Sequence, residues 1–264
     1  MKTPPRRRSK KKKSLRLQAA ATASASLPRE SAVVPKRWVK VVVALFLIPV
    51  ALILTQAFFG SLTKSMKNDF WQTEEFWFFS LGVVLWLVLY FGLLRKFWLP
   101  LGIYIFGHEC THVLITWLMG GTVQEFRIHR TGGYVVTNRV NTWIALAPYF
   151  VPLYSIVAIM AFSGLSLFFE VWPYRIVLYA AIGATWAFHF CYTCIMIPKG
   201  QTDLAYGGSF FSLTIIYLMN LLILILLMIL ASPQVTWRGF GHEVVFYADR
   251  FLTQVHWLLN RIGP

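Results

Sequence analysis

The chain has few charged residues, very few acids and little cysteine. Only 13 % of its 264 residues are Asp, Glu, Lys or Arg, whereas 57 % are hydrophobic. A soluble globular domain carries about 25 % charged residues, so this composition argues against an ordinary soluble domain and favours lipid as the surrounding medium. The three cysteines, Cys110, Cys191 and Cys194, all lie in apolar segments, which argues against a disulfide framework.

The positive charge is concentrated at the start of the chain. Residues 1–40 hold 13 of the 25 Lys and Arg and a single acid, Glu30, which leaves the rest with a net charge of only +3. The sequence predicts a disordered polybasic cytoplasmic arm over 1–38 that contacts anionic lipid. A transit peptide for an organelle membrane fits the same composition. Nucleic-acid binding is not expected, because no aromatic residue interleaves with these charges before Trp38.

Long apolar segments follow the arm. A bilayer core of about 30 Å requires about 20 helical residues. Six segments meet this requirement: 39–62, 76–94, 99–119, 143–168, 173–197 and 210–231. Because backbone polar groups must be satisfied within lipid, these segments are predicted to be helices. The sequence therefore predicts an all-α, multi-pass integral membrane protein with a transmembrane domain over 39–232, and the basic arm places its N-terminus in the cytoplasm.

Three local patterns refine this picture. The fourth span carries Pro148 and Pro152, which predict a kink or a break. After the third span, alternation over 123–137 around a Gly-Gly turn predicts a β-hairpin, whose partner would be a third strand, the membrane surface or a bound peptide. The C-terminal segment 236–264 has apolar residues at steps of four and three. That spacing is typical of a helix in the membrane interface, with helix pairing as the alternative.

The segment 99–119 contains a His-Glu-x-x-His pattern from His108 to His112. Residues four apart lie on one face of a helix, so both imidazoles can bind one metal ion. Glu109 projects nearby, where it can accept a proton from a water molecule that the metal polarises. It is also the only acid well inside a predicted span, and such acids are costly in lipid. The pattern therefore predicts a zinc site with Glu109 as the general base.

A catalytic zinc site takes three protein ligands and a water molecule. The candidates for the third ligand are Asp203, His189 and Glu170. Asp203 is preferred, because it lies in a glycine-flanked loop that can re-enter the membrane to reach the metal. His189 lies halfway along the fifth span, where a hydrogen-bonded core histidine is the alternative interpretation. Glu170 stands at the boundary of a span and fits a solvated end residue.

Together these features resemble the site-2 protease family of intramembrane zinc metallopeptidases. The resemblance rests on the Gly-His-Glu-x-x-His sequence at 107–112, on the probable hairpin that follows, and on the downstream loop that contains Asp203. It implies that His108, His112 and Asp203 hold Zn²⁺. It also implies that Glu109 activates water to cleave a transmembrane helix of the substrate.

The sequence thus predicts a zinc endopeptidase whose substrate is a membrane protein or a peptide. An extended substrate would pair with the edge of the hairpin. Asn141, just before the fourth span, would either bond such a substrate strand or serve as a helix N-cap. The alternative is a non-hydrolytic membrane protein that uses the same residues as a structural or sensory zinc site, or as a metal or proton pathway.

Overall fold

The computed structural model describes residues 36–129, 132–232 and 234–262. Most of these residues are helical, and a small two-stranded antiparallel sheet joins them. Residues 1–35 of the predicted basic arm lie outside the described residues. The first described helix, α2 (Arg37–Lys67), begins at the end of that arm and includes the predicted span 39–62.

Long apolar helices form the body of the molecule. Within the described residues, four are long and apolar enough to cross a membrane: α2, α3 (Glu74–Gly92), the segment Trp172–Lys199 around α7 (Arg175–Met196), and α9 (Ser209–Ala231). These helices match the first, second, fifth and sixth predicted spans. The structure is therefore compatible with a multi-pass membrane protein.

The predicted fourth span is broken, as its prolines indicated. Helix α5 (Thr142–Leu146) continues into a 3-10 turn, Ala147–Tyr149, and α6 (Leu153–Leu165) leaves at 79° to the first part. Pro148 lies in the 3-10 turn and Pro152 is the N-cap of α6. Because proline lacks an N–H, neither residue can continue the α-helical hydrogen bonding. Counted as one bent span, this pair would be a fifth crossing.

The predicted third span forms a helix that is less apolar than the others. A helix does form there, α4 (Leu99–Leu118), but it is not among the helices that are apolar enough to qualify as spans. Its glycines, two histidines, one glutamate and two threonines lower its mean hydropathy. The six predicted crossings become four in the described part of the chain, or five with the bent pair. The polar residues that reduce the span count are those that build the site described below.

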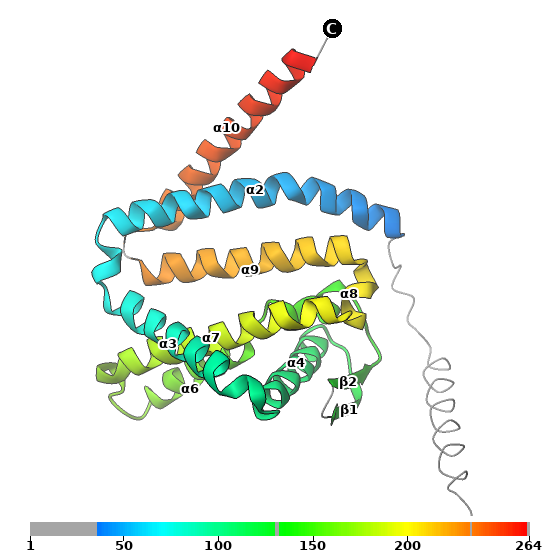
Figure 1. The fold of residues 1–264 in the computed structure, drawn as a ribbon, viewed down its shortest axis with the longest axis vertical. Helices are drawn as coiled ribbons and strands as arrows, with labels where there is room; N and C mark the ends of the chain where they lie inside the picture. Colours follow the sequence, from blue (N-terminus) through cyan, green and yellow to red (C-terminus); the bar gives the residue numbers. More distant parts are fainter. Residues whose placement is uncertain (1–35, 130–131, 233, 263–264) are drawn as a thin grey trace, which may run out of the picture.

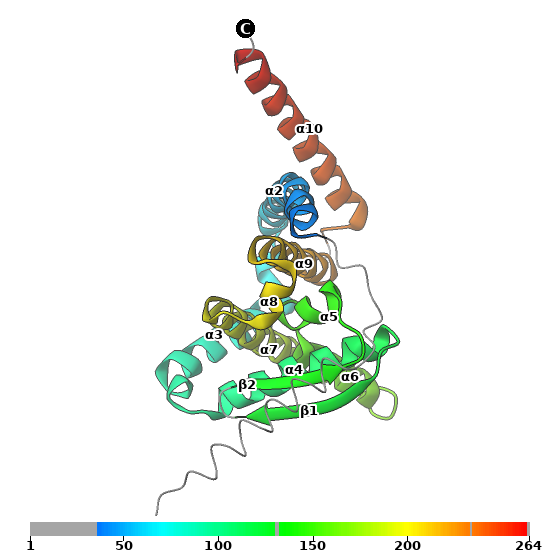
Figure 2. The same ribbon diagram turned by 90° about the vertical axis from the view of Figure 1, so that its right-hand side faces the viewer.

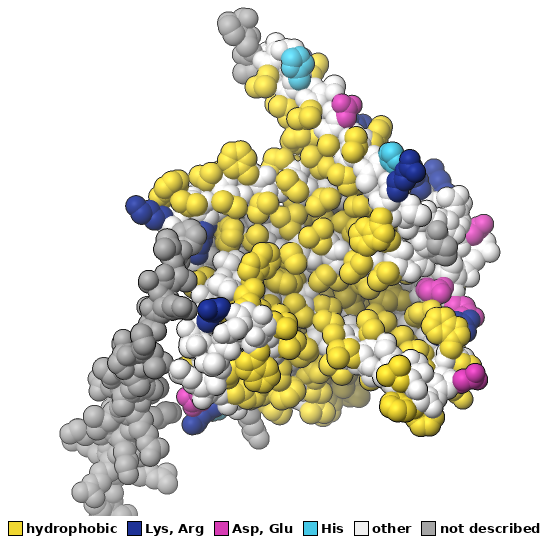
Figure 3. Space-filling model, turned by 180° about the vertical axis from the view of Figure 1, so that it is seen from behind, with side chains coloured by type: hydrophobic (Ala, Val, Ile, Leu, Met, Phe, Trp, Pro, Cys, Tyr) yellow, Lys and Arg dark blue, Asp and Glu magenta, His cyan; other side chains and the backbone are white. Residues whose placement is uncertain are grey.

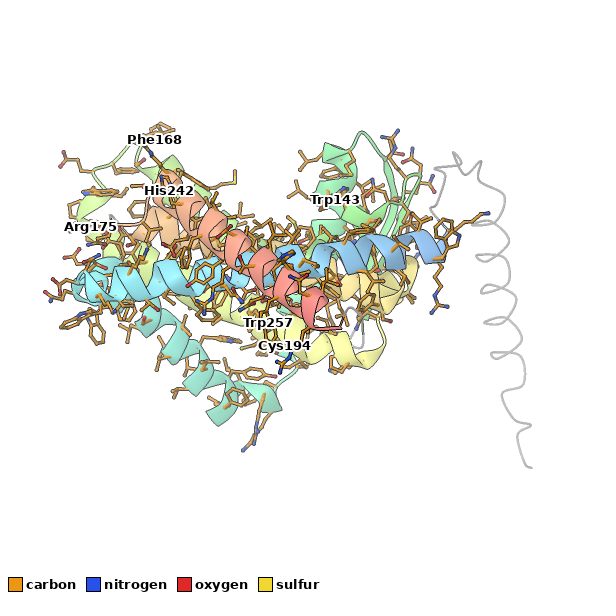
Figure 4. The ribbon with its side chains drawn as sticks, turned by 90° about the horizontal axis from the view of Figure 1, so that it is seen from above. Trp143, Phe168, Arg175, Cys194, His242 and Trp257 are labelled. Atoms are coloured by element: carbon orange, nitrogen blue, oxygen red, sulfur yellow. The ribbon has the colours of Figure 1, made fainter. Side chains whose placement is uncertain are left out.

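Two of the long apolar helices, α2 and α9, lie side by side. Figure 1 shows α2 and α9 running next to each other in the same direction, with α3, α4, α6 and α7 on one side of the pair. A buried cluster that includes Ala57, Leu221 and Ile225 joins α2 to α9. Helix α10 (Trp237–Ile262) packs on α2 at its beginning and then projects from the body. Seen from above, it crosses α2 between His242 and Trp257 (Figure 4). The predicted C-terminal helix is thus present.

The surface has the distribution that a membrane body requires. Figure 3 shows a broad hydrophobic area over the middle of one face, with charged side chains gathered near its two margins. The exposed large hydrophobic residues of α2 and α9 include Phe46, Phe59 and Leu222. Apolar surface of this extent is costly in water, so lipid is the medium that suits it.

The predicted hairpin is also present. Strand β1 (Val123–His129) pairs antiparallel with β2 (Gly132–Thr137), and Ile128 stands opposite Gly133. Figure 2 shows the hairpin lying along α4, and both strands contact that helix. The hairpin therefore covers the helix that carries the His-Glu-x-x-His pattern.

Candidate metal centre

The two motif histidines lie on one face of α4, as their spacing predicts. Their ring centres are 4.9 Å apart, and their side chains are only 10 % and 12 % exposed. The Nδ1 atom of His112 is 2.8 Å from the carbonyl oxygen of Ile144. A carbonyl can only accept, so Nδ1 carries a proton, and Nε2 is the atom that faces Asp203. On His108, Nδ1 is 3.4 Å from the hydroxyl of Tyr104, so Nε2 is again the inward atom.

Asp203 completes the cluster from a distant part of the sequence. It lies in the short helix α8 (Thr202–Gly207), between α7 and α9. Its Oδ2 atom is 3.3 Å from His108 Nε2 and 3.6 Å from His112 Nε2. Within the described residues these are the side chains whose ligand atoms form a metal-sized group, all within 4.8 Å of one another. The structure thus brings together the three predicted ligands.

Two of the separations in this group are close to those expected around a metal ion. Nitrogen and carboxylate oxygen ligands bind zinc at about 2.0–2.2 Å, so two such atoms around a tetrahedral ion lie about 3.3–3.5 Å apart. The separations between Asp203 Oδ2 and the two imidazole nitrogens fall near that range. Two imidazoles and a carboxylate suit several divalent transition metals. The arrangement is therefore a candidate metal site, and its geometry alone does not select zinc.

Electrostatics also favours an ionised Asp203. Burial by itself would raise the pKa of its carboxyl, but hydrogen bonds and charge attraction from His108 and His112 together outweigh burial. They hold this pKa well below its usual range. The hydroxyl of Tyr149 donates a further hydrogen bond to Oδ2 at 3.1 Å. The carboxylate is thus available as an anionic ligand at neutral pH.

Packing explains why α8 reaches the histidines. Leu204, next to Asp203, is buried in a cluster with Leu146, Ala147 and Ile216. The backbone at Gly200 and Gly208, on either side of the helix, is left-handed or otherwise at positive φ. The glycine-flanked loop predicted from sequence therefore folds as a short helix that is anchored by its apolar side.

Glu109 lies in the same cavity as the three ligands. It is only 6 % exposed, and the cavity has a volume of about 360 Å³. One wall of the cavity is β2, which passes directly over the glutamate at Gly133. A Cβ atom at that position would come within 2.6 Å of Glu109 Cγ, so a glycine is required for this close approach. The hairpin is thus in direct contact with the predicted general base.

The remaining candidate residues lie outside the group of three ligands. Asn141 is the N-cap of α5, accepting from the Ile144 N–H at 2.8 Å, which confirms the capping interpretation. It is not among the residues that line the cavity, and its role toward a substrate stays a prediction. His189 is 7 % exposed and lies outside the ligand group, as does the exposed Glu170.

Three supporting residues were not identified from the sequence. Tyr149 is fully buried, and its ring lies edge-on to His108 with centres 5.2 Å apart. Tyr104 contacts the same histidine, and Gly133 contacts Glu109. Tyr149 lies between the two prolines that break the fourth span. The predicted break was the one feature of the sequence that drew attention to this position.

Comparison of the chain with protein-family models, with curated proteins and with solved structures found no match. A functional assignment therefore rests on the site itself.

Proposed function

We propose that the protein is an intramembrane zinc metalloendopeptidase that hydrolyses peptide bonds within or next to the bilayer. The observation that carries this proposal is the cluster of His108, His112 and Asp203 at one cavity with Glu109. The same four residues carry the resemblance to the site-2 protease family. Two histidines and one carboxylate are a ligand set of catalytic zinc sites, which keep an open position for a water molecule or a substrate.

In this proposal each residue of the site has its own role. When bound, zinc supplies Lewis-acid activation of a water molecule and of a peptide carbonyl group. Glu109 is the group placed to accept the proton from water and to pass it to the leaving amine. The carbonyl oxygen of Ile144 and the hydroxyl of Tyr149 orient His112 and Asp203, as outer hydrogen bonds commonly do for metal ligands.

The cavity suits an extended peptide. Strand β2 forms one wall, and a strand edge can pair with an extended chain through backbone hydrogen bonds. A transmembrane helix would have to unwind locally before its scissile bond could enter. The substrate in this proposal is thus a membrane protein or a membrane-bound peptide with a segment that is easily extended.

The alternative is a non-hydrolytic protein with a structural or sensory metal site, or a metal or proton transporter. A structural zinc site is closed by a fourth protein ligand. In the part of the chain that the structure describes, the group has three members, which favours the catalytic form.

The test uses the full chain reconstituted in liposomes with end-labelled, single-span polypeptides that carry glycine and proline within the span. We expect about one zinc ion per chain. We expect Glu109→Gln to keep that metal and to lower the cleavage rate by about 10²- to 10⁴-fold, the range for loss of a general base. Glu170→Gln, at an exposed carboxylate outside the site, is the matched control and should cleave normally.

Two outcomes would count against the proposal. Full activity in Glu109→Gln would refute the mechanism. Zinc flux across the liposome membrane without any cleavage would favour the transporter.

A further inference from the structure

Lys40 is a buried lysine near the start of α2. The residue is 5 % exposed, and it is the one buried Lys or Arg among the residues that the structure describes. A charge removed from water is costly unless polar partners compensate it. The groups that contact the Lys40 ammonium group therefore indicate which part of the molecule it stabilises.

The Lys40 ammonium group makes two contacts with Tyr206, at the end of α8. Lys40 Nζ donates to the carbonyl oxygen of Tyr206 at 2.9 Å and lies 4.7 Å from the centre of the same residue's ring. The last carbonyl groups of a helix have no partner within the helix and carry partial negative charge. The ammonium group thus satisfies the end of α8 and also makes a cation–π contact there. Figure 1 shows α8 beside the start of α2.

Helix α8 depends on such contacts. It has six residues, and isolated helices shorter than about 12 residues are marginal in water. Its other anchors include the hydrogen bond from Ser212 Oγ to the carbonyl oxygen of Leu204 at 2.9 Å. Asp203 precedes Tyr206 by three residues, close to one turn of the helix. A shift of the Tyr206 backbone would therefore move the Asp203 carboxylate.

We propose that Lys40 is a positioning residue for the metal centre, which holds α8 so that the Asp203 carboxylate meets His108 and His112. The inference rests on the proposed function, in that these three residues must bind zinc. A functional constellation has to be held to within about 0.5 Å. Loss of an outer-shell contact of this kind commonly weakens metal binding about 10- to 100-fold.

The test measures zinc affinity of the full-length protein in detergent, by competition with a chromogenic chelator. Lys40→Met keeps the length of the side chain and removes its charge and donors. We expect it to weaken zinc binding by about tenfold or more, while the unfolding temperature measured in excess chelator stays close to that of the wild type. Lys40→Arg restores donors and charge and should recover most of the affinity.

The matched control is Lys36→Met. Lys36 is exposed at the same end of α2, so the variant loses the same charge without touching α8. We expect wild-type zinc affinity. Equal affinities of Lys40→Met and the wild type would overturn the proposal, as would an equal loss in both lysine variants.

A second pair of variants decides the matter if Lys40→Met does not fold. Tyr206→Leu removes the ring under the ammonium group, whereas Tyr206→Phe removes only the hydroxyl that donates to Val140 O at 3.2 Å. We expect weaker zinc binding in the leucine variant than in the phenylalanine variant, and equal binding in both would overturn the proposal. Failure of the proposed function has a separate signature, because then the wild type itself binds no zinc or binds zinc and cleaves no peptide.

Discussion

At the scale of single residues, the candidate metal ligands are held by hydrogen bonds from outside the ligand set. Tyr149 illustrates this most clearly. Its hydroxyl donates to Asp203, its ring packs against His108, and its carbonyl oxygen accepts from Asn220 of α9 at 3.0 Å. One buried residue thus connects two candidate ligands, through its side chain, to a long apolar helix, through its backbone.

This connection predicts the behaviour of Tyr149→Phe. The ring stays and its packing is kept, but the carboxylate of Asp203 loses a donor. We expect zinc affinity to fall by about tenfold, the lower end of the range for outer-shell changes, as measured by chelator competition. Tyr217→Phe is the control, because that hydroxyl meets Thr55 away from the site. Wild-type affinity in Tyr149→Phe would show that the hydroxyl does not orient Asp203.

The sequence and the structure agree best on features that depend on near neighbours. The facing of His108 and His112 follows from the pitch of a helix, and the break at Pro148 follows from a missing N–H. Asp203 could be preferred on the basis of its flanking glycines, but its distance to the histidines required the structure. The contacts of Tyr149 and Lys40 join segments far apart in sequence, and no local pattern indicates them.

At the scale of elements, α3 and α7 approach so closely that two glycines are required. A Cβ at Gly82 would lie 2.0 Å from the carbonyl oxygen of Ala180, and one at Gly183 would lie 2.0 Å from that of Phe79. Small residues let helix backbones approach in membranes, where packing drives association. The contact between α3 and α7 helps to hold the part of the molecule that contains α4.

We therefore expect Gly183→Val to destabilise the protein. Overpacking of this kind costs about 1–3 kcal/mol, and a backbone oxygen has little room to move. The measurement is the denaturation midpoint in detergent micelles. Gly164→Val is the control, because no atom lies within 4 Å of a Cβ built there. Equal midpoints for the two variants would contradict the close approach of α3 and α7.

One predicted element, the third span, is less apolar than its length suggested. Segment 99–119 has the length of a span, and its helix forms at nearly those bounds. Length and the surrounding apolar residues suggested a crossing, whereas the polar residues on α4 lower its hydropathy below that of the four helices apolar enough to cross a membrane. A segment that must hold a metal site cannot be as apolar as one that faces only lipid.

At the scale of the whole molecule, contacts show which ends of the long helices lie together. Gln234 Nε2 donates to the carbonyl oxygen of Asn68 at 2.9 Å, which places the ends of α2 and α9 together. Their beginnings meet through Lys40 and Tyr206. Helix α2 has 31 residues and is therefore about 46 Å long, enough to exceed a bilayer core of about 30 Å. The metal centre lies toward the beginnings.

This arrangement predicts the sidedness of labelling. In a variant with the native cysteines replaced by alanine, single cysteines would be placed at Lys36, Asp69 and Gln234. A membrane-impermeant maleimide added to one side of sealed, oriented vesicles should label position 36 without 69 or 234, and the opposite side should give the reverse. Position 36 is expected to face the cytoplasm, because positive charge favours that side. Labelling of all three positions from one side would rule out a crossing by α2.

The contact between Lys40 and Tyr206 joins residues 166 positions apart, which has a consequence for biosynthesis. At about 5–20 residues per second, a ribosome adds Tyr206 roughly 8–33 s after Lys40. From the addition of His112 until that of Asp203, the nascent chain carries both histidines and the glutamate but lacks the carboxylate that completes the site. Under the proposed function, a newly made molecule would therefore stay inactive toward neighbouring nascent membrane proteins until most of its own helices have been made.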